Sequence, residues 1–164
     1  MRKIISLVFL VFLFLNCEDD YSMVRKAIDA VNETTPAATW DGQQLKSISL
    51  VKGVYVVEFY ITGFGSLPQK YEIDKPDLIK CGTFIIANFM TAYDYSKQGE
   101  KSEGNEKMFM QVGQLIEMLA NNEVGIRFKL ESNDERLLSF EMSPDDVIKA
   151  ARLRKDSFYE KYGN

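Results

Sequence analysis

An alternating apolar pattern in the C-terminal half constrains the fold of this chain most strongly. The apolar positions are Val124, Ile126, Phe128 and Leu130 before a polar turn, and Leu138, Phe140 and Met142 after it. The turn is Ser132-Asn133-Asp134, and most of the alternate positions are charged or small. Successive side chains of a strand point to opposite faces, so one face of this hairpin is apolar and the other is charged. The pattern therefore predicts a sheet that is covered on one side only.

A second hairpin and four helices complete the predicted order of elements. Residues 45–51 and 54–62 suit strands, and Lys52-Gly53 provides a two-residue turn between them. Apolar residues at helical spacing predict helices over residues 20–32, 74–93, 108–119 and 143–159. Asp74 with Pro76, and Ser143 with Pro144, are typical helix starts. Gly82 and several β-branched residues leave open a strand within residues 83–90.

Both halves of the chain run helix, hairpin, helix. The halves are residues 23–94 and 105–164, and the polar segment Ser96 to Lys107 between them is expected to be a loop. We predict a single α+β domain over residues 23–164. In it, an antiparallel sheet of about four strands, made of two hairpins, carries helices on one face. The shared order suggests an internal duplication, although the two sequences are not visibly repeated.

Composition excludes several classes of function. The chain has no histidine, which removes His-based triads, His-ligated metal sites and imidazole general bases. Its 20 basic and 24 acidic side chains give a formal net charge of −4, which argues against nucleic-acid binding. Two cysteines cannot build a four-thiolate zinc site.

The acidic clusters do not predict catalysis. Asp145 and Asp146 lie in the first turn of a predicted helix, where the helix dipole explains them. Glu131, Asp134 and Glu135 flank a turn, and neither cluster has the spacing of a calcium loop. No GxSxG motif or Walker glycine loop is present. We expect no catalytic residue, no metal site and no cofactor.

Residues 1–16 are predicted to be a signal peptide outside the fold. Arg2 and Lys3 precede an apolar run from Ile4 to Leu15 that only Ser6 interrupts. As a helix this run would span about 18 Å, well short of the ~30 Å hydrocarbon core of a bilayer. A basic start and a short apolar run are typical of secretory signal peptides. The alternative is a buried N-terminal core helix.

The cysteine that directly follows this run, in Phe14-Leu15-Asn16-Cys17, resembles the processing site of bacterial lipoprotein precursors. The resemblance implies that signal peptidase II cleaves before Cys17, that the thiol is diacylated and that the new amino group is acylated. The motif departs from the family at Phe14, where Leu is preferred, and at Asn16, where Gly, Ala or Ser is preferred. Relaxed sites of this kind are similar to those of Bacteroidetes lipoproteins.

An acidic run follows the cysteine. Glu18-Asp19-Asp20 is similar to the surface-export signals of those lipoproteins, and its alternative is a solvated tether over residues 17–22. The resemblance thus implies a lipid anchor at the outer membrane of a Gram-negative bacterium, on the periplasmic face or the cell surface. Two or more acyl chains would give stable anchoring. Loss of Arg2 and Lys3 with the signal peptide would change the formal charge from −4 to −6.

Acylation of Cys17 would leave Cys81 without a disulfide partner. We expect Cys81 to be a buried apolar residue rather than a reactive thiol. A second pattern, Asn32, Pro36, Asp41 and Leu45, lies between a helix and a strand and resembles small uncharacterised bacterial domains. Cys81 matches their mid-domain cysteine, and their second cysteine has no counterpart here. This resemblance implies a fold and no activity.

Two groups of side chains are candidates for binding. Trp40, Tyr55, Tyr60 and Phe64 would suit an apolar, peptide or sugar partner if they were exposed together. The alternative is that Trp40 packs over the edge of the core. The second group is basic and would suit anionic headgroups, or else forms a solvated helix face; it comprises Lys149, Arg152, Arg154, Lys155 and Lys161.

The sequence therefore predicts a membrane-anchored envelope lipoprotein with a non-enzymatic binding, inhibitory or assembly role. Its expected partners are membrane lipid through Cys17 and an unidentified protein or small ligand, with no nucleic acid. One alternative is an immunity- or inhibitor-type lipoprotein that blocks a toxin or hydrolase. Another is a hydrolase that uses carboxylates alone, which would need two of them converging in a cleft.

Overall fold

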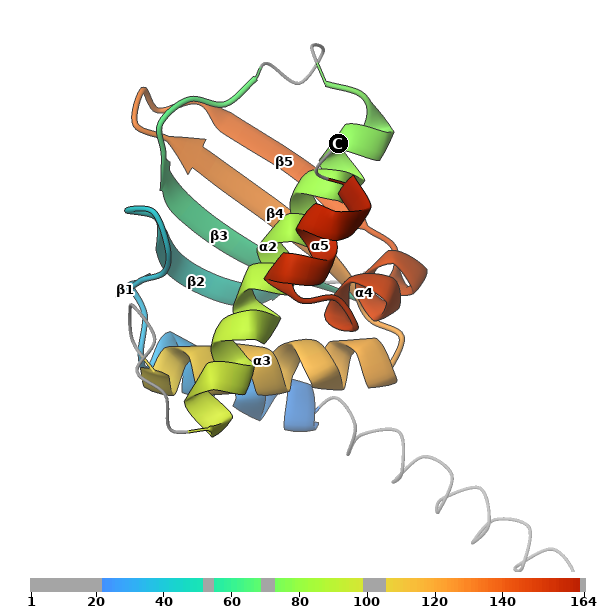
Figure 1. The fold of residues 1–164 in the computed structure, drawn as a ribbon. Coiled ribbons are helices and arrows are strands. Elements are labelled where there is room, and N and C mark those ends of the chain that lie inside the picture. The colour runs from blue at the N-terminus through green and yellow to red at the C-terminus, as the bar shows by residue number, and fades with distance from the viewer. Residues whose placement is uncertain (1–21, 52–54, 69–72, 99–105, 163–164) are drawn as a thin grey trace, which may run out of the picture.

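A computed structural model describes residues 22–51, 55–68, 73–98 and 106–162 of the chain (Figure 1). The predicted signal peptide, Cys17 and all but the last residue of the predicted tether lie outside the described residues, as does the Lys52-Gly53 turn. Among the described helices, none is long and apolar enough to cross a membrane.

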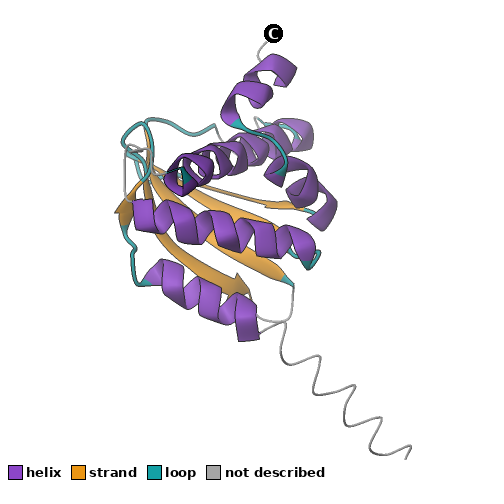
Figure 2. Ribbon diagram, turned by 60° about the horizontal axis from the view of Figure 1, so that its bottom comes forward, coloured by secondary structure: helices purple, strands orange, loops and turns teal. Residues whose placement is uncertain are grey.

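The described chain forms a sheet with helices over one face (Figure 2). A helix over residues 22–32 comes first. The remaining elements, in chain order, are β1 (Ala37–Ala38), β2 (Gln44–Val51), β3 (Val56–Phe64), α2 (Lys75–Lys97), α3 (Glu106–Asn121), β4 (Gly125–Ser132), β5 (Leu137–Met142), α4 (Pro144–Ala151) and α5 (Lys155–Tyr162). The strands lie in the order β1-β2-β3-β4-β5. The predicted α+β class is confirmed, and so is the order helix, hairpin, helix in each half; a common origin of the halves stays a prediction.

Strand pairing differs from the prediction at one junction. The two predicted hairpins are antiparallel, β2 with β3 and β4 with β5. The hairpins meet through β3 and β4, however, which are parallel, so a wholly antiparallel sheet is wrong. Parallel neighbours need a long crossover, and α2 and α3 provide it by returning the chain to the end of the sheet where β3 began. The short strand β1, which pairs with the start of β2, was not predicted.

Local signals place the starts of α2 and α4 correctly, and the first helix ends at residue 32 as predicted. The Asp74 side chain accepts a hydrogen bond from the Asp77 backbone N–H at 2.9 Å, which caps α2 as predicted. Residues 83–90 are helical, so the alternative of a strand within this segment is wrong. The predicted loop from residue 96 to 107 is shorter than expected, because α2 extends to Lys97 and α3 starts at Glu106.

The single helix predicted over residues 143–159 is two helices. Arg154 donates from Nη1 to the carbonyl oxygens of Ala151 and Leu153, at 3.0 and 2.9 Å, and from Nε to the Asp94 carboxylate of α2. The Lys155 N–H, at the start of α5, donates to the Thr91 hydroxyl of α2 at 2.8 Å. The two contacts with α2 are long-range, and beside them α5 packs against α2 through Phe158 and Phe84.

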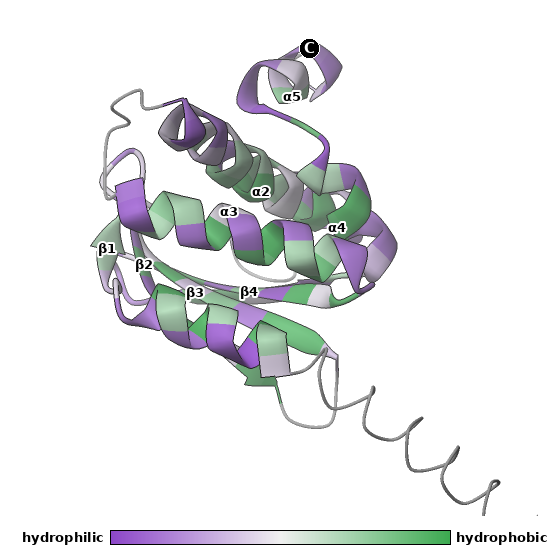
Figure 3. Ribbon diagram, turned by 90° about the horizontal axis from the view of Figure 1, so that it is seen from below, coloured by the Kyte–Doolittle hydropathy of each residue, from purple (hydrophilic) through white to green (hydrophobic). Residues whose placement is uncertain are grey.

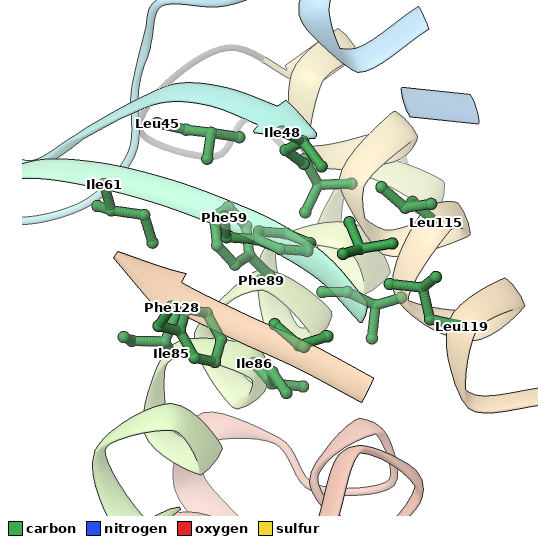
Figure 4. Close-up of a cluster of buried hydrophobic side chains, with 14 of the residues drawn as sticks. Leu45, Ile48, Phe59, Ile61, Ile85, Ile86, Phe89, Leu115, Leu119 and Phe128 are labelled. Carbon is green, nitrogen blue, oxygen red and sulfur yellow. The ribbon is translucent and has the colours of Figure 1, made fainter. Parts of the chain in front are cut away.

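The core lies between the sheet and the helices (Figure 4). Its largest fully buried side chains include Phe59 of β3, Phe89 of α2 and Phe128 of β4. Burying a side chain of this kind contributes about 1.5–3 kcal/mol. Figure 3 shows α2, α3 and α4 on one side of the strands. Helices α2 and α3 approach closely at Gly113 of α3, where a Cβ would lie 2.2 Å from Cγ of Tyr93 of α2.

The β2 edge of the sheet is closed by a side chain. Asn32 donates from Nδ2 to the Ile48 carbonyl at 2.7 Å and accepts from the Ile48 N–H at 2.8 Å. These two bonds satisfy backbone groups that an edge strand leaves unpaired. A bulge between Leu45 and Ser47 adds one residue to β2, so that Leu45 and Ile48 both face the core.

Candidate functional site

The sheet face opposite the helices is open and polar. Its central side chains are Glu58, Tyr60 and Thr62 of β3 and Arg127, Lys129 and Glu131 of β4, all half-buried. The parallel register places them in facing pairs, Glu58 with Arg127, Tyr60 with Lys129 and Thr62 with Glu131. Because strand residues alternate between faces, the same strands that build the core also present this polar surface.

Tyr60 is held by contacts on two sides. Its hydroxyl donates a hydrogen bond to Oε2 of Glu131. The Nζ atom of Lys129 lies 4.5 Å from the centroid of its ring, within range of a cation–π contact. The hydrogen bond to Glu131 is the main reason that the pKa of the Tyr60 hydroxyl is raised, with desolvation adding to it. Tyr60 is therefore a fixed, protonated donor at neutral pH.

Arg127 connects two carboxylates on the same face. Its Nε donates to Oε1 of Glu141 at 2.8 Å, and Nη1 lies 3.7 Å from Oε2 of Glu58. The Glu141 hydrogen bond is the main reason that the pKa of Arg127 is raised. Partly exposed ion pairs of this kind contribute little to stability. Their effect is to neutralise much of the charge at this part of the face.

A polar hollow of about 400 Å³ lies where the open face meets the β4–β5 turn. It is lined by Gly42, Gln44, Lys46, Thr62, Gly63, Glu131, Ser132, Asn133 and Glu135. The Asn133 N–H donates to the Phe64 carbonyl at 2.8 Å, which fixes the turn against the end of β3. The loop before β2, the end of β3 and the β4–β5 turn thus build the hollow together.

The β4–β5 turn is further held by Asp134. The Ser132 hydroxyl donates to this carboxylate, and Nε of Arg136 lies 2.7 Å from its Oδ2. These contacts, the Ser132 hydrogen bond first, lower the pKa of Asp134. The turn that forms one wall of the hollow is therefore stabilised by its own side chains.

The lining of the hollow suits a polar ligand. Lys46 supplies a positive charge, Glu131 and Glu135 supply negative ones, and Gln44 and Asn133 supply amides that both donate and accept. Across the described ranges, no group of three or more acidic or cysteine side chains is placed to hold a metal ion. These residues can form hydrogen bonds and charge pairs with a bound polar ligand.

The four aromatic residues singled out in the sequence lie in different places. Trp40 is half-buried and packs edge-on against Phe89 at 4.7 Å between ring centroids, as its alternative interpretation predicts. Phe64 is half-buried and packs against the core. Tyr60 lies on the open face, and Tyr55 is 65% exposed beside the start of β3. Tyr55 and Phe64 are nine positions apart, about 30 Å along an extended strand, so the structure does not bring the four together.

The basic residues of the last helices are not all available for binding, because Arg154 forms an ion pair with Asp94. Cys81 is a free, half-buried thiol packed against the core. Burial raises its pKa to about 11, so it stays protonated at neutral pH, in keeping with the expected buried apolar residue.

Sequence reasoning missed the part played by Lys46, Lys129 and Glu131. The position of Glu131 beside a turn predicts a solvated residue, whereas its side chain accepts the Tyr60 hydrogen bond and lines the hollow. The alternation of 124–131 marks Lys129 and Glu131 as outward-facing residues. Their approach to Tyr60 depends on the parallel pairing of β3 with β4.

No protein-family model matches the chain, and no curated protein or solved structure matches it either.

Proposed function

We propose that this protein is a lipid-anchored envelope lipoprotein of the Gram-negative outer membrane that binds a partner without catalysing a reaction. The observation that carries the proposal is Cys17, which directly follows a basic start and a short apolar run. In bacterial lipoproteins, which this segment resembles, a cysteine so placed receives the lipid. Attachment of two or more acyl chains would hold the domain at the membrane permanently.

The open sheet face supports a binding role. It carries an ordered set of hydrogen-bonding groups, with Tyr60 fixed between Lys129 and Glu131. The polar hollow beside it offers charges of both signs from Lys46, Glu131 and Glu135. A protein loop or a small polar ligand would find donors and acceptors there without requiring any of these side chains to react.

Metabolic labelling with a radioactive fatty acid tests the anchor. We expect label on the wild type and on Cys17-containing Cys81→Ser, and none on Cys17→Ser. Cys81→Ser is the matched control because it removes the other of the two cysteines. Labelling shows whether Cys17 carries lipid. Membrane fractionation does not, because an uncleaved signal peptide can also hold a protein at the membrane. Undiminished label on Cys17→Ser would contradict the proposal.

A hydrolase is the second candidate function, because Glu131 and Glu135 line the same hollow. Two carboxylates can share the acid and base roles in hydrolysis when they flank the bond that breaks. The purified protein would be tested on chromogenic glycosides and esters, alongside Glu131→Gln and Glu135→Gln. Turnover by the wild type that both variants lose would favour the hydrolase, whereas equal background rates would favour binding.

A further inference from the structure

Two exposed apolar side chains lie at the end of the molecule where the chain leads back to Cys17. Met23 is 57% exposed in the first turn of the helix over residues 22–32, and Tyr55 is 65% exposed immediately before β3. Figures 2 and 3 both show this first turn next to the end of β2 and the start of β3. Met23 and Tyr55 therefore belong to one end of the molecule, although they are far apart in sequence.

Two basic side chains accompany them. Arg25 and Lys26 are both exposed in the same helical turn, and Lys26 lies three residues after Met23 on the same helix face. Tyrosine is enriched at the level of lipid headgroups, where its ring is apolar and its hydroxyl is hydrated. Methionine is flexible and apolar, and basic residues are attracted to lipid phosphates. This combination has the chemistry of a surface that rests on a bilayer.

The short segment between Cys17 and the first helix determines which end of the molecule can lie at the lipid. Five peptide units separate Cys17 from residue 22, which limits their separation to about 18 Å even for a fully extended chain. If Cys17 is lipidated, as the proposed function requires, the start of the helix cannot lie far from the headgroup layer. No other described part of the chain is tied to the bilayer by so few residues.

We propose that Met23, Arg25, Lys26 and Tyr55 form a basal surface that contacts the lipid bilayer, with Met23 and Tyr55 entering the headgroup region. The inference rests on the proposed lipidation of Cys17. It also gives the molecule an orientation. The polar hollow lies near the far end of β3, about 25–30 Å along the strand from Tyr55, and therefore faces away from the membrane.

Fluorescence quenching by brominated lipids tests the basal surface. The protein would comprise residues 17–164 with Cys81→Ala, so that Cys17 is the single thiol and can be coupled to a maleimide lipid. Vesicles would contain phosphatidylethanolamine and phosphatidylglycerol, with and without brominated acyl chains. Trp40→Phe removes the native tryptophan, and Tyr55→Trp places a reporter in the basal surface.

Leu137→Trp in the same background is the matched control. Leu137 is 59% exposed, close to the exposure of Tyr55, and its register opposite Glu131 places it at the hollow end of the sheet. Circular dichroism and urea unfolding would verify that both variants fold. We expect a blue shift and loss of emission on brominated vesicles for the tryptophan at position 55, and neither change at position 137.

Equal quenching at the two positions, or none at position 55 despite complete coupling, would overturn the basal surface. Because the maleimide lipid replaces the natural acyl chains, that result would leave the lipoprotein proposal intact. Absence of fatty-acid label in cells would overturn the lipoprotein proposal instead, whatever the vesicle spectra show. The double substitution Arg25→Ser and Lys26→Ser should reduce the quenching at position 55. Unchanged quenching would show that these two residues do not belong to the basal surface.

Discussion

Gly113 permits the close crossing of the two longest described helices. A Cβ at this position would lie 2.2 Å from Cγ of Tyr93, closer than packed atoms can approach. Gly113→Ala should therefore lower the free energy of unfolding by about 1–3 kcal/mol, because α2 and α3 must move apart. Urea unfolding monitored by circular dichroism would measure the loss. Gly65→Ala is the control, since a Cβ there would meet nothing within 4 Å; equal effects would contradict the crossing.

Cys81 should make stability fall in alkaline solution. Burial raises its pKa from 9.0 to about 11, so between those pH values the unfolded chain loses the thiol proton before the folded protein does. The thiol's contribution is complete below pH 9 and decreases as pH rises to 11, by about 2–3 kcal/mol in all. Urea unfolding of Cys17→Ser and of Cys17→Ser with Cys81→Ala at pH 8 to 11 would measure it. A constant difference between them across this range would disprove the shift.

At the level of the elements, Asn32 joins the first helix to the edge of the sheet. Its side chain bonds both the N–H and the C=O of Ile48, 16 residues away. Asn32→Ala should cost about 1–3 kcal/mol of unfolding free energy, because it leaves two backbone groups unpaired. Asn122→Ala, which removes one exposed bond to the Met118 carbonyl, should cost less than about 0.5 kcal/mol. Similar losses in the two variants would show that the edge contact has no special role.

Local signals predicted most helices and strands, whereas long-range contacts determine where the last helix is divided. The hairpin over residues 124–142 follows from alternation, and the helix starts at Asp74 and Ser143 follow from capping residues. The division of the last helix follows from the pairing of Arg154 with Asp94, which lie 60 residues apart. Apolar spacing alone does not mark the break, because Ala151 and Phe158 lie seven positions apart, in phase with a continuous helix.

The candidate site was less predictable for the same reason. Outward-facing positions such as Lys129 and Glu131 can be read from alternation, but their neighbours cannot. Tyr60 lies beside them because β3 and β4 pair in parallel after a two-helix crossover. For Trp40 the sequence left two interpretations open, an exposed binding residue or packing over the edge of the core, and its contact with Phe89 of α2 favours the second. The sequence identified the residue types, and only the topology could place them together or apart.

At the scale of the whole molecule, the proposals give the protein two functional ends. The basal surface would face lipid, and the polar hollow would face outward to a partner. A photoreactive amino acid in place of Lys46 should therefore become cross-linked to a partner protein in intact cells. The same amino acid in place of Lys26 should not. Glu131→Lys, which reverses a charge in the hollow, should reduce that product. Equal cross-linking from Lys46 and Lys26, or no effect of the charge reversal, would contradict a binding role for the hollow.

The proposed lipid anchor on Cys17 underlies both the proposed function and the basal surface, and mass spectrometry of the mature N-terminus is its direct test. The protein would be extracted from the membranes of the native bacterium and its N-terminal peptide analysed intact. If Cys17 is lipidated, the mature protein will yield a peptide that begins at Cys17 and carries a diacylglyceryl group on sulfur. An unmodified Cys17 inside a peptide that still contains Asn16, or a mature chain that begins at another residue, would contradict it.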